Sequence, residues 1–127
     1  MATAGAKPEE PGTALKPIRW LGDSRARIRE FPEDVKDDMG TALQWAQRGV
    51  KHPDAKPLKG FGSAGVLEVV ENFDGNANRA VYTVKFRKRI YVLHVFQKKS
   101  KKEDQTPRHD MNLINERLKQ AEKAEKN

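Results

Sequence analysis

The stretch VLEVVENFDGNANRAVYTVKFRKRIYVLHVF, residues 66–96, contains three runs that are rich in β-branched and aromatic side chains. Such runs are typical of β-strands when residues that favour turns lie between them. The intervening segments, Asp74-Gly75-Asn76 and Arg87-Lys88, suit hairpin connections. We therefore predict a three-stranded antiparallel meander, with strands over Val66–Phe73, Arg79–Phe86 and Ile90–Phe96.

The segment before the meander carries the signals of one edge strand and two helices. Apolar and basic residues first alternate with a period of two, which predicts a short strand, and Pro17 within it favours a sheet edge. Apolar residues then recur at helical spacing on both sides of Pro32, and Gly49 is a suitable helix stop. The predicted elements are an edge strand over Lys16–Leu21, a short helix that begins at Asp23 or Ser24, and a helix over Pro32–Arg48.

Three further segments complete the chain. Residues 1–15 hold too few large apolar side chains to offset the entropy of ordering, so we expect a flexible lead-in. Gly49–Ala64 shows neither strand nor helix period and is predicted to be a loop. A C-terminal helix should begin at Thr106-Pro107, because apolar residues repeat at helical spacing after this pair.

These elements predict an α+β fold in a single domain over residues 16–126, with the N-terminal helix hairpin on one face of the sheet. The other face is then open for function. In the middle strand, alternation directs one set of side chains toward the helices and the other set outward. The inward set is Ala80, Tyr82, Val84 and Phe86, and the outward set is Arg79, Val81, Thr83 and Lys85.

Composition limits the classes of function. The 127 residues carry a formal net charge of +7, which favours encounters with nucleic acid, acidic proteins or anionic lipid. The chain has no cysteine, so disulfides, thiolate metal sites and thiol nucleophiles are excluded, and its three histidines are isolated. We therefore expect no metal and no cofactor. No segment resembles a membrane span or a signal peptide, and we expect the cytoplasm and no membrane partner.

Four sequence blocks resemble one family of proteins. They are His52–Gly60, Arg79–Val84, Tyr91–Ser100, and Thr106-Pro107 ahead of a helix. In this order and register the chain is similar to the phage-derived, HigB-like branch of the RelE/ParE toxin superfamily, over about residues 16–123.

This resemblance implies a RelE-like antiparallel sheet, made of the edge strand and the meander, and the toxin of a type II toxin–antitoxin pair. It further implies an endoribonuclease that cleaves messenger RNA, usually on the ribosome and without a metal ion. The implied partners are the messenger RNA and a cognate antitoxin, which is commonly a helix-turn-helix protein encoded by the adjacent gene.

The resemblance also implies particular site residues. The arginine of the RelE-type middle strand falls on Arg79, whose planar guanidinium can bind two phosphate oxygens at once. The basic segment after the last strand falls on Lys98, Lys99, Lys101 and Lys102. Such a run attracts a nucleic-acid backbone regardless of sequence, although charge runs also occur as solvated surfaces.

Metal-free RNA cleavage also needs groups that transfer protons. His94 is a candidate acid or base, and Tyr91 is a candidate acid or stacking ring, although both residue types also occur as core residues in strands. Arg108 and His109 lie in the first turn of the last helix, where free backbone amides favour an anion. The remaining candidates for phosphate contact are Lys59 and Lys85.

Two alternatives to a ribonuclease remain open. One is a ParE-like toxin that inhibits DNA gyrase and cleaves nothing. The other is a basic RNA-binding module without catalytic activity. Val69 and Asn78 favour the second alternative, because the resembled branch often has an arginine and an aromatic residue at these positions.

Overall fold

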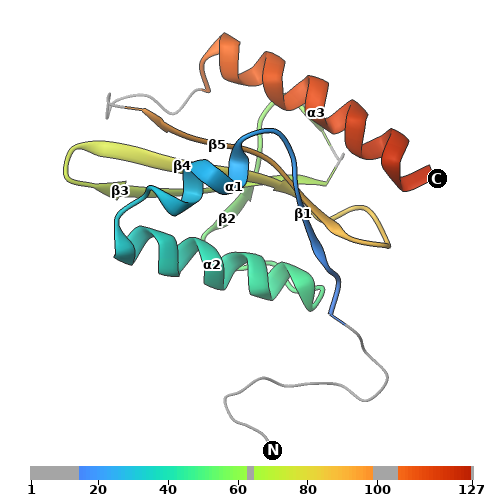
Figure 1. Ribbon diagram of the computed structural model, residues 1–127, viewed down its shortest axis with the longest axis horizontal. Helices are drawn as coiled ribbons and strands as arrows, with labels where there is room; N and C mark the ends of the chain where they lie inside the picture. The colour runs from blue at the N-terminus through green and yellow to red at the C-terminus, as the bar shows by residue number, and fades with distance from the viewer. Residues whose placement is uncertain (1–14, 63–64, 99–105, 127) are drawn as a thin grey trace, which may run out of the picture.

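The computed structural model describes residues 15–62, 65–98 and 106–126. These residues form a five-stranded sheet and three helices, which confirms the predicted α+β class (Figure 1). The strands are β1 (Ile18–Trp20), β2 (Ala55–Pro57), β3 (Val66–Phe73), β4 (Asn76–Thr83) and β5 (Ile90–Lys98). The helices are α1 (Ser24–Arg29), α2 (Glu33–Gln47) and α3 (Arg108–Lys126). The order across the sheet is β1-β5-β4-β3-β2.

The meander is confirmed, although its middle strand begins and ends three residues earlier than predicted, and the first strand pairs differently from the prediction. β3, β4 and β5 are consecutive antiparallel neighbours. β1 lies at an edge as predicted, yet it runs parallel to β5, with Arg19 opposite Tyr91, so the prediction of an antiparallel sheet is wrong for this strand. Alternation indicates which side chains of a strand face inward and says nothing about the direction of its neighbour. A parallel pair needs a long connection, which residues 21–89 provide.

A further strand, β2, lies in the segment that was predicted to be a loop. It pairs antiparallel with β3, with Ala55 opposite Val69 and Pro57 opposite Leu67. Only Ala55 of its three residues is buried, so no alternating pattern marks the strand in the sequence. Pro57 cannot donate to a ladder, which is tolerated because β2 lies at the sheet edge.

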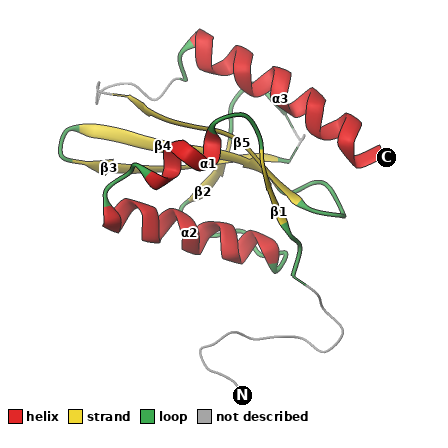
Figure 2. Cartoon of the chain, in the orientation of Figure 1, coloured by secondary structure: helices red, strands yellow, loops and turns green. Residues whose placement is uncertain are grey.

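Helices cover both faces of the sheet, α2 on one and α3 on the other (Figure 2). The predicted packing of the α1–α2 hairpin on one face is confirmed by a core that joins Ile28 and Met39 to Tyr82. The prediction of an open second face is wrong, because Ile114 and Leu118 of α3 are buried against it. A helix with an apolar stripe must bury that stripe, and the second sheet face provides the apolar surface.

The covered face changes the predicted orientation of β4. Ala80 and Tyr82 face α2 as predicted. The outward placement of Arg79, Val81 and Thr83 is wrong, because their exposed fractions are 3%, 0% and 0%. Phe86 also departs from the prediction, since it lies beyond the end of β4, where strand alternation no longer applies, and packs in the cluster beneath α3.

In α2 and α3, the buried apolar residues lie on the side of the helix that faces the sheet. Within the described ranges, no helix offers an apolar stretch long enough to cross a bilayer. Most of the predicted flexible segment, residues 1–14, lies outside the described residues, and Leu15 is exposed.

Candidate functional site

An irregularity in β5 directs His94 toward α3. Val81 of β4 lies opposite His94, whereas the next residue, Tyr82, lies opposite Val92, so Leu93 is an additional residue in the ladder. Such a bulge changes the side to which the following residues point. Leu93 packs in the cluster beneath α3, and His94 contacts α3 as well. The bulge thus aims an imidazole at the helix.

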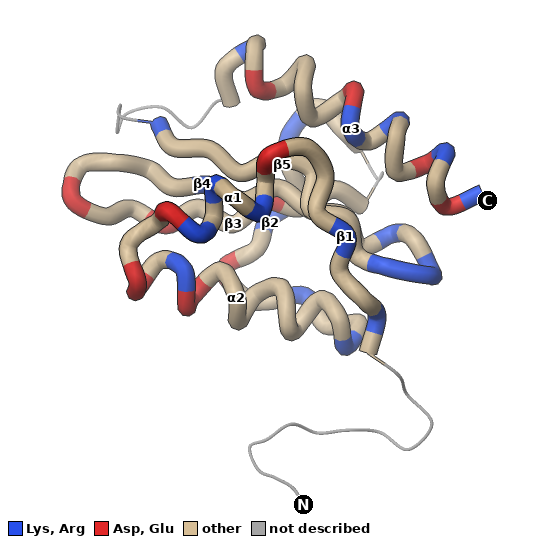
Figure 3. The backbone as a smooth tube through the Cα atoms, viewed as in Figure 1, with Lys and Arg blue, Asp and Glu red and all other residues tan. Residues whose placement is uncertain are grey.

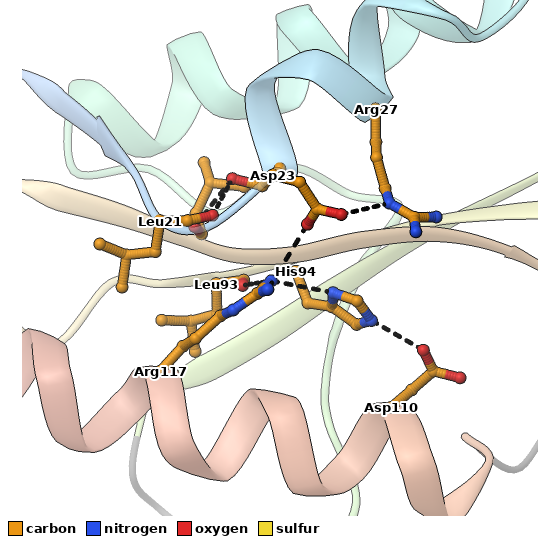
Figure 4. Close-up of polar contacts among 9 residues, drawn as sticks. Leu21, Asp23, Arg27, Leu93, His94, Asp110 and Arg117 are labelled. Atoms are coloured by element: carbon orange, nitrogen blue, oxygen red, sulfur yellow. Dashed lines mark hydrogen bonds and ion pairs between the residues drawn. The ribbon is translucent and has the colours of Figure 1, made fainter.

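Both ring nitrogens of His94 are occupied by α3 side chains (Figure 4). Nε2 lies 2.7 Å from Asp110 Oδ1, and Nδ1 lies 3.2 Å from Arg117 Nη1. Because a guanidinium can only donate, Nδ1 is the acceptor and Nε2 carries the proton that is donated to Asp110. Burial lowers the pKa of His94; the Asp110 carboxylate opposes this shift and the Arg117 charge reinforces it. The imidazole is therefore held neutral.

Arg117 extends this contact into a network between α1, β5 and α3 (Figure 4). Its Nη1 also donates to the Leu93 carbonyl at 3.0 Å, and its Nη2 lies 3.5 Å from Asp23 Oδ1. Asp23 in turn accepts a hydrogen bond from Arg27 at 2.7 Å. Gly22 has a φ of +56°, and a Cβ there would lie 2.4 Å from the Arg117 guanidinium carbon, so a larger residue would strain the backbone and displace the guanidinium.

Arg79 is buried on the same sheet face and paired with Glu68 of β3. Arg79 Nη1 lies 3.2 Å from Glu68 Oε2, and the two side chains are 4% and 13% exposed. Phe96 lies opposite Arg79 in the ladder, and its ring stacks on His94 at a centroid distance of 4.9 Å. Glu68 was not predicted as a site residue. The sequence does contain a signal for Glu68, because it is the only charged residue in the apolar run from Val66 to Val70.

Several predicted residues lie on β5, on the first turn of α3 or on the loop that follows β2. Lys98 follows Phe96 by two residues on β5 and therefore lies on the same face as Arg79. Arg108 and His109 are exposed in the first turn of α3, directly before the Asp110 that binds His94. Lys59 is exposed and precedes Gly60, where a Cβ would lie 3.2 Å from Met111 Cε of α3.

Two predicted residues lie at the other end of α3. Lys85 Nζ is 3.4 Å from Glu122 Oε2, and the Tyr91 hydroxyl donates to Glu125 Oε1 at 2.9 Å. Tyr91 is fully buried, and burial is the main cause that raises its pKa. These side chains do not join Arg79 and His94, so the predicted residues fall into two groups.

The predicted lysine cluster is only partly described. Lys99, Lys101 and Lys102 lie outside the described residues, and Lys98 is the last residue of β5. Among the parts of the chain that the structure describes, no group of three or more His, Asp or Glu side chains is arranged to hold a metal ion.

Fold and site together define a small α+β protein with a buried, charged cluster at one end of a sheet that helices cover on both faces. The family model described as "Phage derived protein Gp49-like (DUF891)" matches residues 26–119. No curated protein and no solved structure matches the chain. The matched segment runs from α1 into α3 and contains β2 to β5. The chain therefore belongs to the Gp49-like family of phage-derived proteins, and this membership suggests a toxin-like function.

Proposed function

We propose that this chain is the toxin of a type II toxin–antitoxin pair and cleaves messenger RNA on the ribosome without a metal ion. Membership of the Gp49-like family supports a toxin-like role. The resemblance to the HigB-like branch supports RNA cleavage, and the meander between helices is compatible with a RelE-like arrangement. The proposed partners are the message and a helix-turn-helix antitoxin.

The observation that carries the proposal is the Arg79–Glu68 pair. A carboxylate that can accept a proton lies 3.2 Å from a permanent cation, on two adjacent strands of a rigid sheet. Metal-free cleavage requires this combination of a base and a cation. Lys98 adds a second cation on the same face.

These residues suggest how the phosphodiester bond would break. Glu68 takes the proton of the ribose 2′-hydroxyl, whose oxygen then forms a bond to the adjacent phosphorus. Arg79, whose buried side chain must first move toward the phosphate, stabilises the charge on the phosphate oxygens, and the bond from phosphorus to the 5′ oxygen breaks. The products are a 2′,3′-cyclic phosphate and a 5′-hydroxyl end.

The leaving 5′ oxygen also needs a proton. His94 is a poor donor, because Asp110 and Arg117 occupy both of its nitrogens. We assign this transfer to His109, which is exposed in the adjacent turn of α3, and assign His94 to holding that turn through Asp110.

Glu68→Gln is the sharpest variant for testing the proposal, because it retains the side-chain shape and a contact to Arg79 but removes the base. The protein and its variants are induced in bacteria, and new 5′-hydroxyl ends in messages are mapped. Wild type should generate such ends, and Glu68→Gln should reduce them by about 10²-fold or more. Co-expression of a helix-turn-helix protein encoded next to the chain should suppress them.

Glu33→Gln is the matched control, because Glu33 pairs with Lys36 at 3.5 Å on α2, away from the site. It should leave the number of new ends unchanged. Far-UV circular dichroism of each purified variant establishes that it is folded. Intact messages together with a supercoiling defect would instead identify a gyrase inhibitor.

A second candidate function is RNA binding without cleavage. The burial of Arg79 at 3% exposure and the occupied nitrogens of His94 favour it, because neither group reaches a ligand without a side-chain movement. Intact messages and normal supercoiling, combined with RNA that co-purifies with the protein, would support this candidate.

A further inference from the structure

A second group of cations lies on the connection between β4 and β5. Lys85, Arg87, Lys88 and Arg89, here called the hairpin cluster, place four positive charges within five residues. The connection lies at the opposite end of β5 from Lys98 (Figure 3). Eight residue steps along β5 separate Ile90 from Lys98, or about 26 Å at 3.3 Å per residue.

Interactions with the protein hold several of these cations in place. Lys85 Nζ lies 5.0 Å from the centre of the Phe86 ring, and Arg89 Nη1 donates to the Tyr91 hydroxyl at 3.0 Å. Lys88 Nζ donates to the Glu125 backbone carbonyl at 3.2 Å. Ordered cations lose less conformational entropy on binding an anion than free side chains do.

The hairpin cluster surrounds a hollow that suits an anion. The hollow has a volume of about 590 Å³ and is lined by Lys85, Phe86, Arg87, Lys88 and Glu125. Three of these residues are cations and one is an anion. Glu122 of α3 also pairs with Lys85 at 3.4 Å, and the sum of these charges is still positive. Glu125 is already engaged, because it accepts hydrogen bonds from Lys88 N–H and from the Tyr91 hydroxyl.

We propose that the hairpin cluster binds the phosphodiester backbone of RNA at a second contact, separate from the Arg79 site. The inference rests on the proposed function in taking RNA as the ligand. Arginine guanidinium groups and lysine ammonium groups both donate charge-assisted hydrogen bonds to phosphate oxygens. Arg79 lies opposite Phe96, which is six residue steps from Ile90 along β5, or about 20 Å. Because this distance exceeds the screening length of about 8 Å at physiological salt, the two sites attract RNA independently.

The surface of the hairpin favours RNA over a protein or a membrane. The exposed large apolar residues of the described ranges are Leu15, Val50 and Phe73, and none belongs to the hairpin. Protein interfaces rely on buried apolar or aromatic anchors, and membrane attachment requires inserted apolar groups. A backbone contact needs charge alone.

The salt dependence of RNA binding tests this inference. A labelled 2′-O-methyl oligouridine, which has no 2′-hydroxyl to react, is titrated with the full chain over a series of salt concentrations. The variant Arg87→Gln/Lys88→Gln removes two exposed cations. Its slope of log affinity against log salt should be shallower than that of the wild type by about 1.4.

Arg25→Gln/Arg29→Gln is the matched control, because it removes two exposed arginines of α1 and lowers the net charge equally. Its slope should match that of the wild type. Equal slopes for the hairpin variant and the control would overturn the inference. A second result would also overturn the inference: the hairpin variant loses binding to polyglutamate, while its slope of log RNA affinity against log salt equals that of the wild type. This result would indicate an acidic protein partner.

The result is independent of the cleavage experiment. If the hairpin variant has a shallower slope and messages in bacteria are not cleaved, the proposed RNA contact is supported and the proposed nuclease activity is contradicted. Cleaved messages combined with an unchanged slope retain the nuclease and remove the contact.

Discussion

At the residue scale, the surroundings of two acid–base side chains shift their pKa values toward the neutral form. Burial lowers the pKa of His94, which favours the uncharged imidazole. Burial, a hydrogen bond to Asp38 and the negative charges of Asp38, Asp54 and Asp34 raise the pKa of Glu71 to about 7. Near neutral pH the protein therefore suppresses one positive and part of one negative charge, which makes its stability sensitive to pH.

We expect Glu71→Gln to stabilise the protein at alkaline pH. The pKa of Glu71 is higher in the folded state, at about 7 against an ordinary value of 4.5. The folded state thus binds more protons in this interval, and stability falls as pH rises through it. Gln removes that loss. The gain should be on the order of 1 kcal/mol at pH 8.

Urea denaturation at pH 4 and pH 8 provides the measurement. Wild type and Glu71→Gln should be equally stable at pH 4, where Glu71 is protonated in both states. The control Glu116→Gln changes an exposed residue of α3 and should have little effect at either pH. A gain for Glu71→Gln that is the same at both pH values would contradict the explanation.

Two features of the site show what sequence can predict at this scale. Arg79 was recognised by resemblance, and its sheet face follows from strand alternation. The direction of His94 was unpredictable, because Tyr91 to Phe96 are apolar on both faces and the bulge at Leu93 shifts the alternation by one residue. The burial of Arg79 was not predicted, because strand alternation does not show whether the second face of the sheet is covered.

At the element scale, α3 joins the two ends of the sheet. Its first half binds His94 through Asp110 and Arg117. Its last turn contacts the hairpin cluster through Glu122 and Glu125. Between these polar contacts, its apolar stripe is buried on the sheet, so the packing of one helix positions both the partners of His94 and those of the hairpin cluster.

Ile114→Ala should weaken that packing strongly. Ile114 is fully buried at the centre of the cluster beneath α3. Truncation of a buried isoleucine leaves a cavity and should lower the free energy of unfolding by about 2–5 kcal/mol. Asn115→Ala changes the exposed neighbour and should alter it by less than about 0.5 kcal/mol. Similar urea midpoints for the two variants would show that α3 contributes little to stability.

The elements with strong periodicity were predicted, although β4 lies three residues earlier than expected, and those without it were not. The two N-terminal helices, the meander and α3 follow from apolar spacing and turn residues. β2 was missed because it has three residues and one buried side chain. The face that α3 covers was not predictable, because an apolar stripe shows that a helix is buried without showing against which surface.

At the scale of the whole molecule, the sheet is shared by two apolar clusters. β4 contributes Ala80 and Tyr82 to the cluster beneath α2, and Val81 to the cluster beneath α3. β5 likewise supplies side chains to both clusters. Neither cluster can lose its packing without loosening a strand that the other requires.

We therefore expect a single cooperative unfolding transition. Trp20 packs against the cluster on the α2 side, and Trp45 belongs to α2, so tryptophan fluorescence reports that side. Far-UV circular dichroism reports all helices, including α3. The two signals should change at the same urea concentration. Loss of circular dichroism before fluorescence would show that α3 separates first.

The parallel pair of β1 and β5 also affects how the chain matures during synthesis. Ile18 emerges early, but its ladder partner, Ile90, follows 72 residues later (90 − 18). β1 therefore cannot pair until β5 has been synthesised, and pairings between residues so far apart in the sequence form slowly. A nascent polypeptide that is released before residue 90 would have no sheet edge on which its first strand could dock.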